Sequence, residues 1–384
     1  MNKLKLLFLL SLISIVGICQ TNYYPLLKQA NKLREEKKIK EAIEIYLEVE
    51  KLKPYDNEAI SWLGWCYNDL NLYSDAVVIL KKAKPPFTKK IFHELGFAYR
   101  KLKLYNEAVS YFESALILEP KSYSTNYQLA KTYEEKKDIE NAITYYKICE
   151  NIVDEESRTL ISATYKTEPL ENLMYCYNST EKYYDAIVVG EKAISKKKTV
   201  FAFSELGYAY YKIKQNEKAI DAYKQALSID PKYGTAYKGI GDVYRRNYSP
   251  AKTSDALENY KKAVELNPYS AGSNFGVGWC LNEQGKYYDA SFYLVKAINL
   301  DNNLIAAYTE LGYAQYMQNL NTEAINTFKK GITLESKNKL CRYYLGLVYV
   351  KIKEKSNALT MVNELYNLDQ ILSTKLKAKV DSMY

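Results

Sequence analysis

Residues 200–232 read VFAFSELGYAYYKIKQNEKAIDAYKQALSIDPK, and they decide the fold because they contain two helical patterns joined by a short turn. Four residues recur at the spacing i, i+3, i+4 and i+7, which places them on one face of a helix: Phe203, Leu206, Gly207 and Tyr210. A second helical face starts at Ala219 and ends before Pro231, since proline cannot donate a hydrogen bond within a helix. The stretch therefore predicts a helix, a turn and an antiparallel helix.

The same unit recurs along the chain, and one alanine marks every copy. The ten alanines are Ala42, Ala76, Ala108, Ala142, Ala186, Ala219, Ala256, Ala290, Ala324 and Ala358. Their spacing is 32 to 37 residues, with one gap of 44. A period of this length indicates one supersecondary unit copied many times, so we expect a continuous stack instead of the two or three domains that 384 residues would otherwise suggest.

The pattern resembles the tetratricopeptide repeat. Two copies carry its full signature: Phe92-Leu95-Gly96-Tyr99-Ala108-Phe112-Ala115-Pro120 and Phe203-Leu206-Gly207-Tyr210-Ala219-Tyr223-Ala226-Pro231. Other copies depart from it, as the fifth does with Met174 in the glycine position and Gly190 in that of the second aromatic. The resemblance implies an all-α, right-handed superhelical solenoid of about ten helix-turn-helix repeats over residues 20–370.

The two ends of the chain and one insertion differ from the repeat. Lys3 and Lys5 precede an apolar run too short to span a bilayer, so residues 1–19 predict a secretory signal peptide cleaved before Gln20. We expect an exported, periplasmic protein, and a lipid anchor on Cys19 is the alternative. An irregular insertion near 155–166 indicates either a surface loop or a kink between two arms of the solenoid. Residues 371–384 predict a C-terminal capping helix, because an open stack needs a polar end.

Composition argues against several functions. The formal charge of +9 is spread along the chain and arginine is scarce, so we expect no nucleic-acid partner. No second apolar run reaches spanning length, so we expect no transmembrane span. His93 is the only histidine, and no Walker or paired CxxC motif occurs, so we expect no catalytic residue, metal or cofactor. The five cysteines beyond residue 19 are expected to be small buried side chains, because their number is odd: Cys66, Cys149, Cys176, Cys280 and Cys341.

In the family that the chain resembles, the first helices of the repeats line a concave groove that binds partner segments. At that register this chain carries many aromatic side chains, which bury a large area at low entropy cost. The candidate groove residues are Trp62, Trp65, His93, Phe97, Tyr127, Tyr175, Tyr208, Lys238, Asp242, Arg245, Arg246, Phe275, Trp279, Tyr313 and Tyr343. The same aromatics could instead pad one repeat against the next. Arg245 and Arg246 could hold a carboxylate or phosphate, or lie in a solvated loop.

These features favour a non-enzymatic scaffold for protein–protein interaction that binds a peptide or a helical segment in the groove. Two alternatives stay open. One is a structural or assembly subunit of a cell-envelope complex, which would act through its convex face or its ends and could self-associate. The other is a protein that binds glycans or cell-wall fragments, with Trp65 and Trp279 stacked on sugar faces.

Overall fold

The computed structural model describes residues 22–156, 167–247 and 252–383. The predicted signal peptide and most of the insertion near 155–166 lie outside these residues. The chain divides into two compact units, Met1–Thr180 and Glu181–Tyr384, which we call unit 1 and unit 2 and describe separately.

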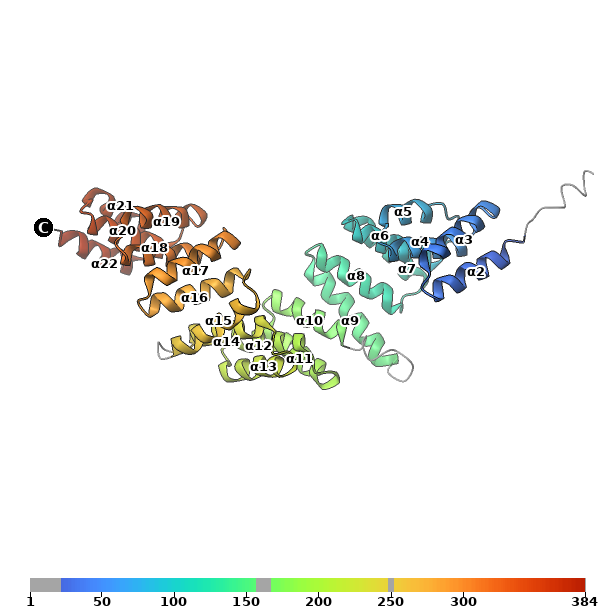
Figure 1. The fold of residues 1–384 in the computed structure, drawn as a ribbon, viewed down its shortest axis with the longest axis horizontal. Helices are drawn as coiled ribbons and strands as arrows, with labels where there is room; N and C mark the ends of the chain where they lie inside the picture. The colour runs from blue at the N-terminus through green and yellow to red at the C-terminus, as the bar shows by residue number, and fades with distance from the viewer. Residues whose placement is uncertain (1–21, 157–166, 248–251, 384) are drawn as a thin grey trace, which may run out of the picture. The chain divides into compact units, whose positions relative to one another are not determined.

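Every element in the described part of the chain is an α-helix, and the 21 helices include four antiparallel pairs followed by α10 in unit 1, and α11, five antiparallel pairs and one final helix in unit 2 (Figure 1). In unit 1 the helices are α2 (Tyr24–Glu35), α3 (Ile39–Leu52), α4 (Asn57–Asp69), α5 (Tyr73–Leu80), α6 (Lys89–Lys101), α7 (Tyr105–Leu118), α8 (Tyr123–Glu135), α9 (Ile139–Glu156) and α10 (Glu168–Ser179). In unit 2 they are α11 (Tyr183–Lys196), α12 (Val200–Lys212), α13 (Asn216–Ile229), α14 (Gly234–Asn247), α15 (Thr253–Leu266), α16 (Ala271–Glu283), α17 (Tyr287–Leu300), α18 (Ile305–Met317), α19 (Asn321–Leu334), α20 (Lys339–Lys351), α21 (Lys355–Tyr366) and α22 (Gln370–Asp381).

Within each unit, the second helices pack against their own first helix and against the helix that follows, except α11, whose first helix belongs to unit 1. First helices of neighbouring repeats also contact one another, as α4 does with α6 and α16 with α18. The first helices therefore share one surface, which we call the first-helix face. The solvent side of the second helices is called the second-helix face. The predicted all-α repeat fold is confirmed within each unit.

The turn inside each repeat follows one geometry. In nine repeats the residue that ends the turn has a positive φ, for example Asn71 at 61° and Lys214 at 63°. In the second repeat, the amide of Leu72 donates to the carbonyl of Tyr67 over 2.8 Å, which closes the helix end in a left-handed cap. Only one of these nine residues is glycine (Gly285), so hydrogen bonds of this kind hold the turn even where a Cβ is present.

The repeated alanines form the centre of the core, since the relative exposure of all ten is 0%. Most of the repeated glycines face a large side chain of the second helix, and Gly346 faces Leu376 of α22. A Cβ on Gly96 would lie 2.7 Å from the ring of Phe112, and one on Gly312 would lie 2.5 Å from that of Phe328. In most repeats these glycines make room for a buried ring or leucine.

The other structural expectations concern the cysteines and the C-terminus. The five cysteines in the described residues are buried and free, as expected: Cys66, Cys149, Cys176, Cys280 and Cys341. The C-terminal helix is α22, which buries Leu376 and Val380 at 0% exposure. In the described part of the chain, no helix is long and apolar enough to cross a membrane.

Candidate functional site

The structure places every candidate groove residue on a first helix. In unit 1 they lie on α4 (Trp62, Trp65), α6 (His93, Phe97), α8 (Tyr127) and α10 (Tyr175); in unit 2 they lie on α12 (Tyr208), α14 (Lys238, Asp242, Arg245, Arg246), α16 (Phe275, Trp279), α18 (Tyr313) and α20 (Tyr343). Most are half-buried, while Tyr175, Tyr208 and Arg246 are exposed. Most of these side chains therefore pack against a neighbouring repeat and still reach the surface.

In unit 1 the two tryptophans of α4 meet edge to face, with ring centres 6.3 Å apart. The guanidinium of Arg34 lies 3.4 Å from the ring centre of Trp62, and the ammonium of Lys90 lies against the same ring. Burial lowers the pKa of Lys90 to about 7, because the charged form is poorly solvated there. Cation–π contacts therefore hold this tryptophan in place.

Next along the first-helix face, Nδ1 of His93 lies 3.0 Å from Oγ1 of Thr125 on α8. Burial lowers the pKa of His93 to about 4, so the ring is neutral at pH 7. The neighbouring Glu94 is 7% exposed, and burial raises its pKa to about 7. Close to both residues is a cavity of about 370 Å³, lined by Trp65, Asn68, Asp69, Asn71, Tyr73, His93, Glu94, Phe97, Lys101 and Gln128.

In unit 2, three charged candidates on α14 form ion pairs with one another: Lys238, Asp242 and Arg245. Asp242 accepts hydrogen bonds from Nζ of Lys238 over 2.6 Å and from the hydroxyl of Tyr260 over 2.7 Å. Nε of Arg245 donates to the same hydroxyl over 3.0 Å, and its guanidinium lies 5.6 Å from the ring centre of Trp279. Arg245 is thus engaged with neighbouring side chains, whereas the neighbouring Arg246 is exposed.

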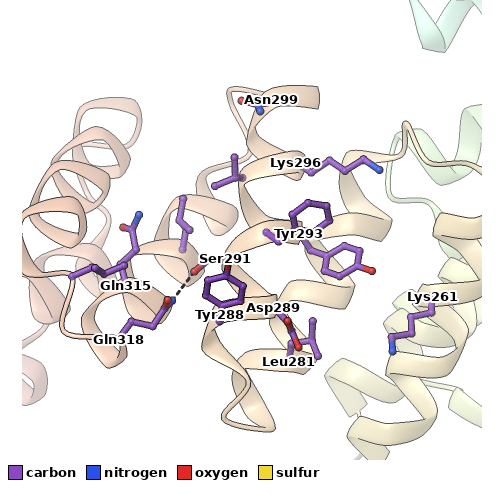
Figure 2. Close-up of a pocket in the computed structure, with 14 residues that line it drawn as sticks. Lys261, Leu281, Tyr288, Asp289, Ser291, Tyr293, Lys296, Asn299, Gln315 and Gln318 are labelled. Carbon is purple, nitrogen blue, oxygen red and sulfur yellow. Dashed lines mark hydrogen bonds between the residues drawn. The ribbon is translucent and has the colours of Figure 1, made fainter.

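The sequence analysis missed a second surface on the second-helix face of unit 2. Tyr288, Phe292 and Val295 are 82%, 65% and 44% exposed along one side of α17. They line a hollow of about 880 Å³ together with residues of α15, α16, α18 and the turn before α19. Figure 2 shows Lys261 on one side of α17 and Gln315 and Gln318 on the other, with Nε2 of Gln318 bonded to Oγ of Ser291 over 2.8 Å. A signal was available, because the solvent side of a helix rarely carries a run of large apolar residues.

Other residues near the candidates were also missed. Asn68 and Glu94 in unit 1, and Asn282 and Glu310 in unit 2, are polar residues that face neighbouring first helices. No group of histidine, cysteine or acidic side chains in the described ranges has the geometry of a metal site.

Comparison with known proteins supports the repeat assignment. Models of the tetratricopeptide repeat match residues 90–122, 123–151 and 200–233. The small glutamine-rich tetratricopeptide repeat-containing protein 2 of Mycosarcoma maydis is 37% identical over 91 residues, which cover 23% of this chain and 25% of that protein. The TPR repeat-containing protein MJ1428 of Methanocaldococcus jannaschii is 23% identical over 259 residues, covering 64% of this chain and 45% of its own length. The chain thus spans less than half of either relative.

Among known structures, that of pilF from Pseudomonas aeruginosa matches with a TM-score of 0.50 at 15% identity and covers 56% of this chain and 97% of its own. At this identity the likeness concerns the fold alone.

Proposed function

Because the chain contains tetratricopeptide repeats, whose proteins are generally scaffolds for protein interaction, we propose that it is an exported, non-enzymatic scaffold. Its partner is a protein, which presents a peptide or a helical segment to the first-helix face. The observation that carries the proposal is the set of partly accessible aromatic rings on that face, of which Trp65 and Phe97 help to line a cavity of about 370 Å³ in unit 1. Such rings supply affinity at about 25 cal/mol per Å² buried, before ordering costs.

The test compares how well the parent and two variants, each with three alanine substitutions, capture partner proteins. The first replaces Trp65, Phe97 and Trp279 with alanine and strips the first-helix face. The second replaces Tyr184, Tyr288 and Phe292 with alanine and strips the second-helix face, where these side chains are exposed. Both must keep the helicity of the parent. A partner retained by the parent and the second variant, and lost by the first, supports the proposal. A partner kept equally by all three contradicts it.

Export rests on the predicted signal peptide. We expect the mature chain, isolated from cells that express the full sequence, to begin at Gln20 and to be periplasmic. Determination of its N-terminus and mass tests this point. A lipid-modified N-terminal Cys19 would favour the anchored alternative, and a chain that retains Met1 would contradict export.

A second candidate function is self-assembly through the second-helix face. The observation that favours it is the exposed pair Tyr288 and Phe292, which stands at the register that Tyr184 and Val188 occupy on α11, with exposures of 73% and 68%. A second copy of the chain would cover such apolar side chains. Light scattering at rising concentration should show a dimer that Phe292→Ser abolishes. A monomer at every concentration contradicts self-assembly.

A further inference from the structure

A longer period is superimposed on the repeats, because every third repeat shares residues that the others lack. Residues 65–76 read WCYNDLNLYSDA, residues 175–186 read YCYNSTEKYYDA and residues 279–290 read WCLNEQGKYYDA. Each is followed by the triplet Glu-Leu-Gly in the next first helix, at 94–96, 205–207 and 310–312. The first copy lies within unit 1 and the third within unit 2, whereas the middle copy crosses the boundary between the units.

In unit 1 this motif builds a closed hydrogen-bonded frame. Nδ2 of Asn68 on α4 donates to the carbonyl of Glu94 on α6 over 3.0 Å and to its Oε2 over 2.9 Å. The rings of Tyr73 and Phe97 meet edge to face at 6.4 Å. Asn68 is only 5% exposed, and its own Oδ1 has no hydrogen-bond donor, which is a costly state for a buried acceptor.

Unit 2 repeats the frame with the same two hydrogen-bond distances. Nδ2 of Asn282 on α16 donates to the carbonyl of Glu310 on α18 over 3.0 Å and to its Oε2 over 2.9 Å. Tyr287 and Tyr313 meet edge to face at 6.0 Å. Asn282 is 3% exposed, and its Oδ1 again lacks a donor. The same unmet acceptor therefore stands at the same register in both units.

The surroundings of the frame are rich in acceptors and aromatic faces. In unit 2, the ring centres of Tyr344 and Tyr313 lie 5.2 Å apart. Burial raises the pKa of both hydroxyls, and the negative charge of Glu283 raises both further. Burial raises the pKa of Glu310, and the negative charge of Glu283 raises it further. Arg245 is the cation that counteracts this shift, and it is already held by Asp242 and Tyr260.

We propose that this frame is a recurring subsite for a guanidinium or ammonium side chain of the partner. The inference rests on the proposed function, since the partner segment must lie on the first-helix face. A cationic donor meets the chemistry of the subsite in two ways. Its N–H groups donate to the carboxylate at the edge of the frame, which is Glu283 in unit 2 and Asp69 in unit 1. Its charge is attracted to the faces of Trp279 and Tyr313 in unit 2, or of Trp65 and Phe97 in unit 1.

The two copies of the frame differ in the cations that lie near them. In unit 1, Lys101 lines the cavity, and its ammonium lies 5.5 Å from the ring centre of Phe97. Burial raises the pKa of Glu94, and the charge of Lys90 counteracts this shift. In unit 2, Met317 stands where Lys101 stands in unit 1. The cation of unit 2 is Arg245, whose guanidinium lies 5.6 Å from the ring centre of Trp279 and is held by Asp242 and Tyr260.

Intrinsic fluorescence can test the proposal, because the chain has only three tryptophans. The double variant Trp62→Phe, Trp65→Phe leaves Trp279 as the reporter. It is titrated at 0.15 M salt with a blocked octapeptide of alternating alanine and arginine, and with the same peptide carrying neutral citrulline. We expect a saturable change with arginine and about tenfold weaker binding with citrulline.

Glu283→Gln in that background is expected to weaken arginine-peptide binding about fivefold, since it removes one carboxylate from the subsite. Glu258→Gln on α15 is the matched control, because it changes the net charge equally and lies outside the subsite. Equal binding of both peptides, equal losses in both variants, or no saturable change would each overturn the cation subsite. None of these outcomes touches the proposed function, which depends on loss of a partner protein in the alanine variants.

Discussion

The recurring subsites of unit 1 and unit 2 have the same frame and different charges. In both, an asparagine of one repeat donates twice to a glutamate of the next, with equal distances of 3.0 and 2.9 Å. Around the unit 1 frame stand Asp69, Lys90 and Lys101, whereas Glu283, at the register of Asp69, and Arg245 stand near the unit 2 frame.

This difference separates what holds the repeats together from what would select a partner. The buried asparagine and glutamate of the frame make the same contact between neighbouring first helices in both units. The charged residues at its edge differ between the two copies. The two frames therefore differ in their cations, since two lysines stand near the first and an arginine already held by Asp242 and Tyr260 stands near the second.

The largest expected effect tests whether the packing beneath the two subsites is the same. Gly96→Val and Gly312→Val should each lower the free energy of unfolding by about 2–3 kcal/mol, because the added atoms overlap a buried ring. The rings are Phe112 and Phe328. Urea unfolding followed by circular dichroism measures the loss. Gly234→Ala is the control, since its Cβ would have 3.4 Å of space. A tolerated valine in either unit would mean that the two frames are packed differently.

A smaller effect is expected from removal of the asparagine in each frame. Asn68→Ala and Asn282→Ala should each cost about 1–2 kcal/mol, because the glutamate carbonyl and carboxyl lose their donor while they stay buried. Thermal unfolding of the two variants, beside the exposed-site control Asn299→Ala, measures this cost. If only one variant is destabilised, the equivalence of the two subsites fails.

The last expected effect is a dependence of stability on pH, which compares Glu94 in unit 1 with Glu310 in unit 2. In the folded chain the pKa of Glu94 is about 7, above its ordinary value of 4.5, because the carboxyl is buried. The folded state therefore holds this proton when the unfolded state has lost it, so stability falls as pH rises from about 4.5 to about 7. Glu94→Gln should remove this slope, because the amide has no proton to lose in this window. Melting temperatures between pH 4.5 and 7 provide the measurement, with Glu310→Gln as the comparison from unit 2. A parent and a Glu94→Gln variant with parallel profiles would contradict the assignment.

Much of the fold could be predicted from the sequence. Apolar residues at helical spacing gave the helix pairs, and the ten alanines marked a position where only a small side chain fits between two helices. The candidate groove residues were placed on first helices for the same reason, since their register follows from the repeat. Whether they bind a partner is a separate question, which remains a proposal.

The register could not show which neighbours each polar side chain meets. Arg245 was a candidate for an external anion, yet the fold engages it with Asp242 and Tyr260. The exposed stripe of α17 could have been recognised from its run of large apolar residues, but only the packing of the neighbouring helices shows the hollow that Phe292 lines.

The sequence by itself determined the repeat, its helix pairs and its buried small residues, because these depend on contacts within about 34 residues of chain. The tertiary structure decided which side chains of successive repeats meet. Asn282 and Glu310 are 28 residues apart and become hydrogen-bonded partners only when α16 packs against α18. That packing also fixes the electrostatics, since the burial that raises the pKa of Glu94 and Glu310 exists only in the stacked chain.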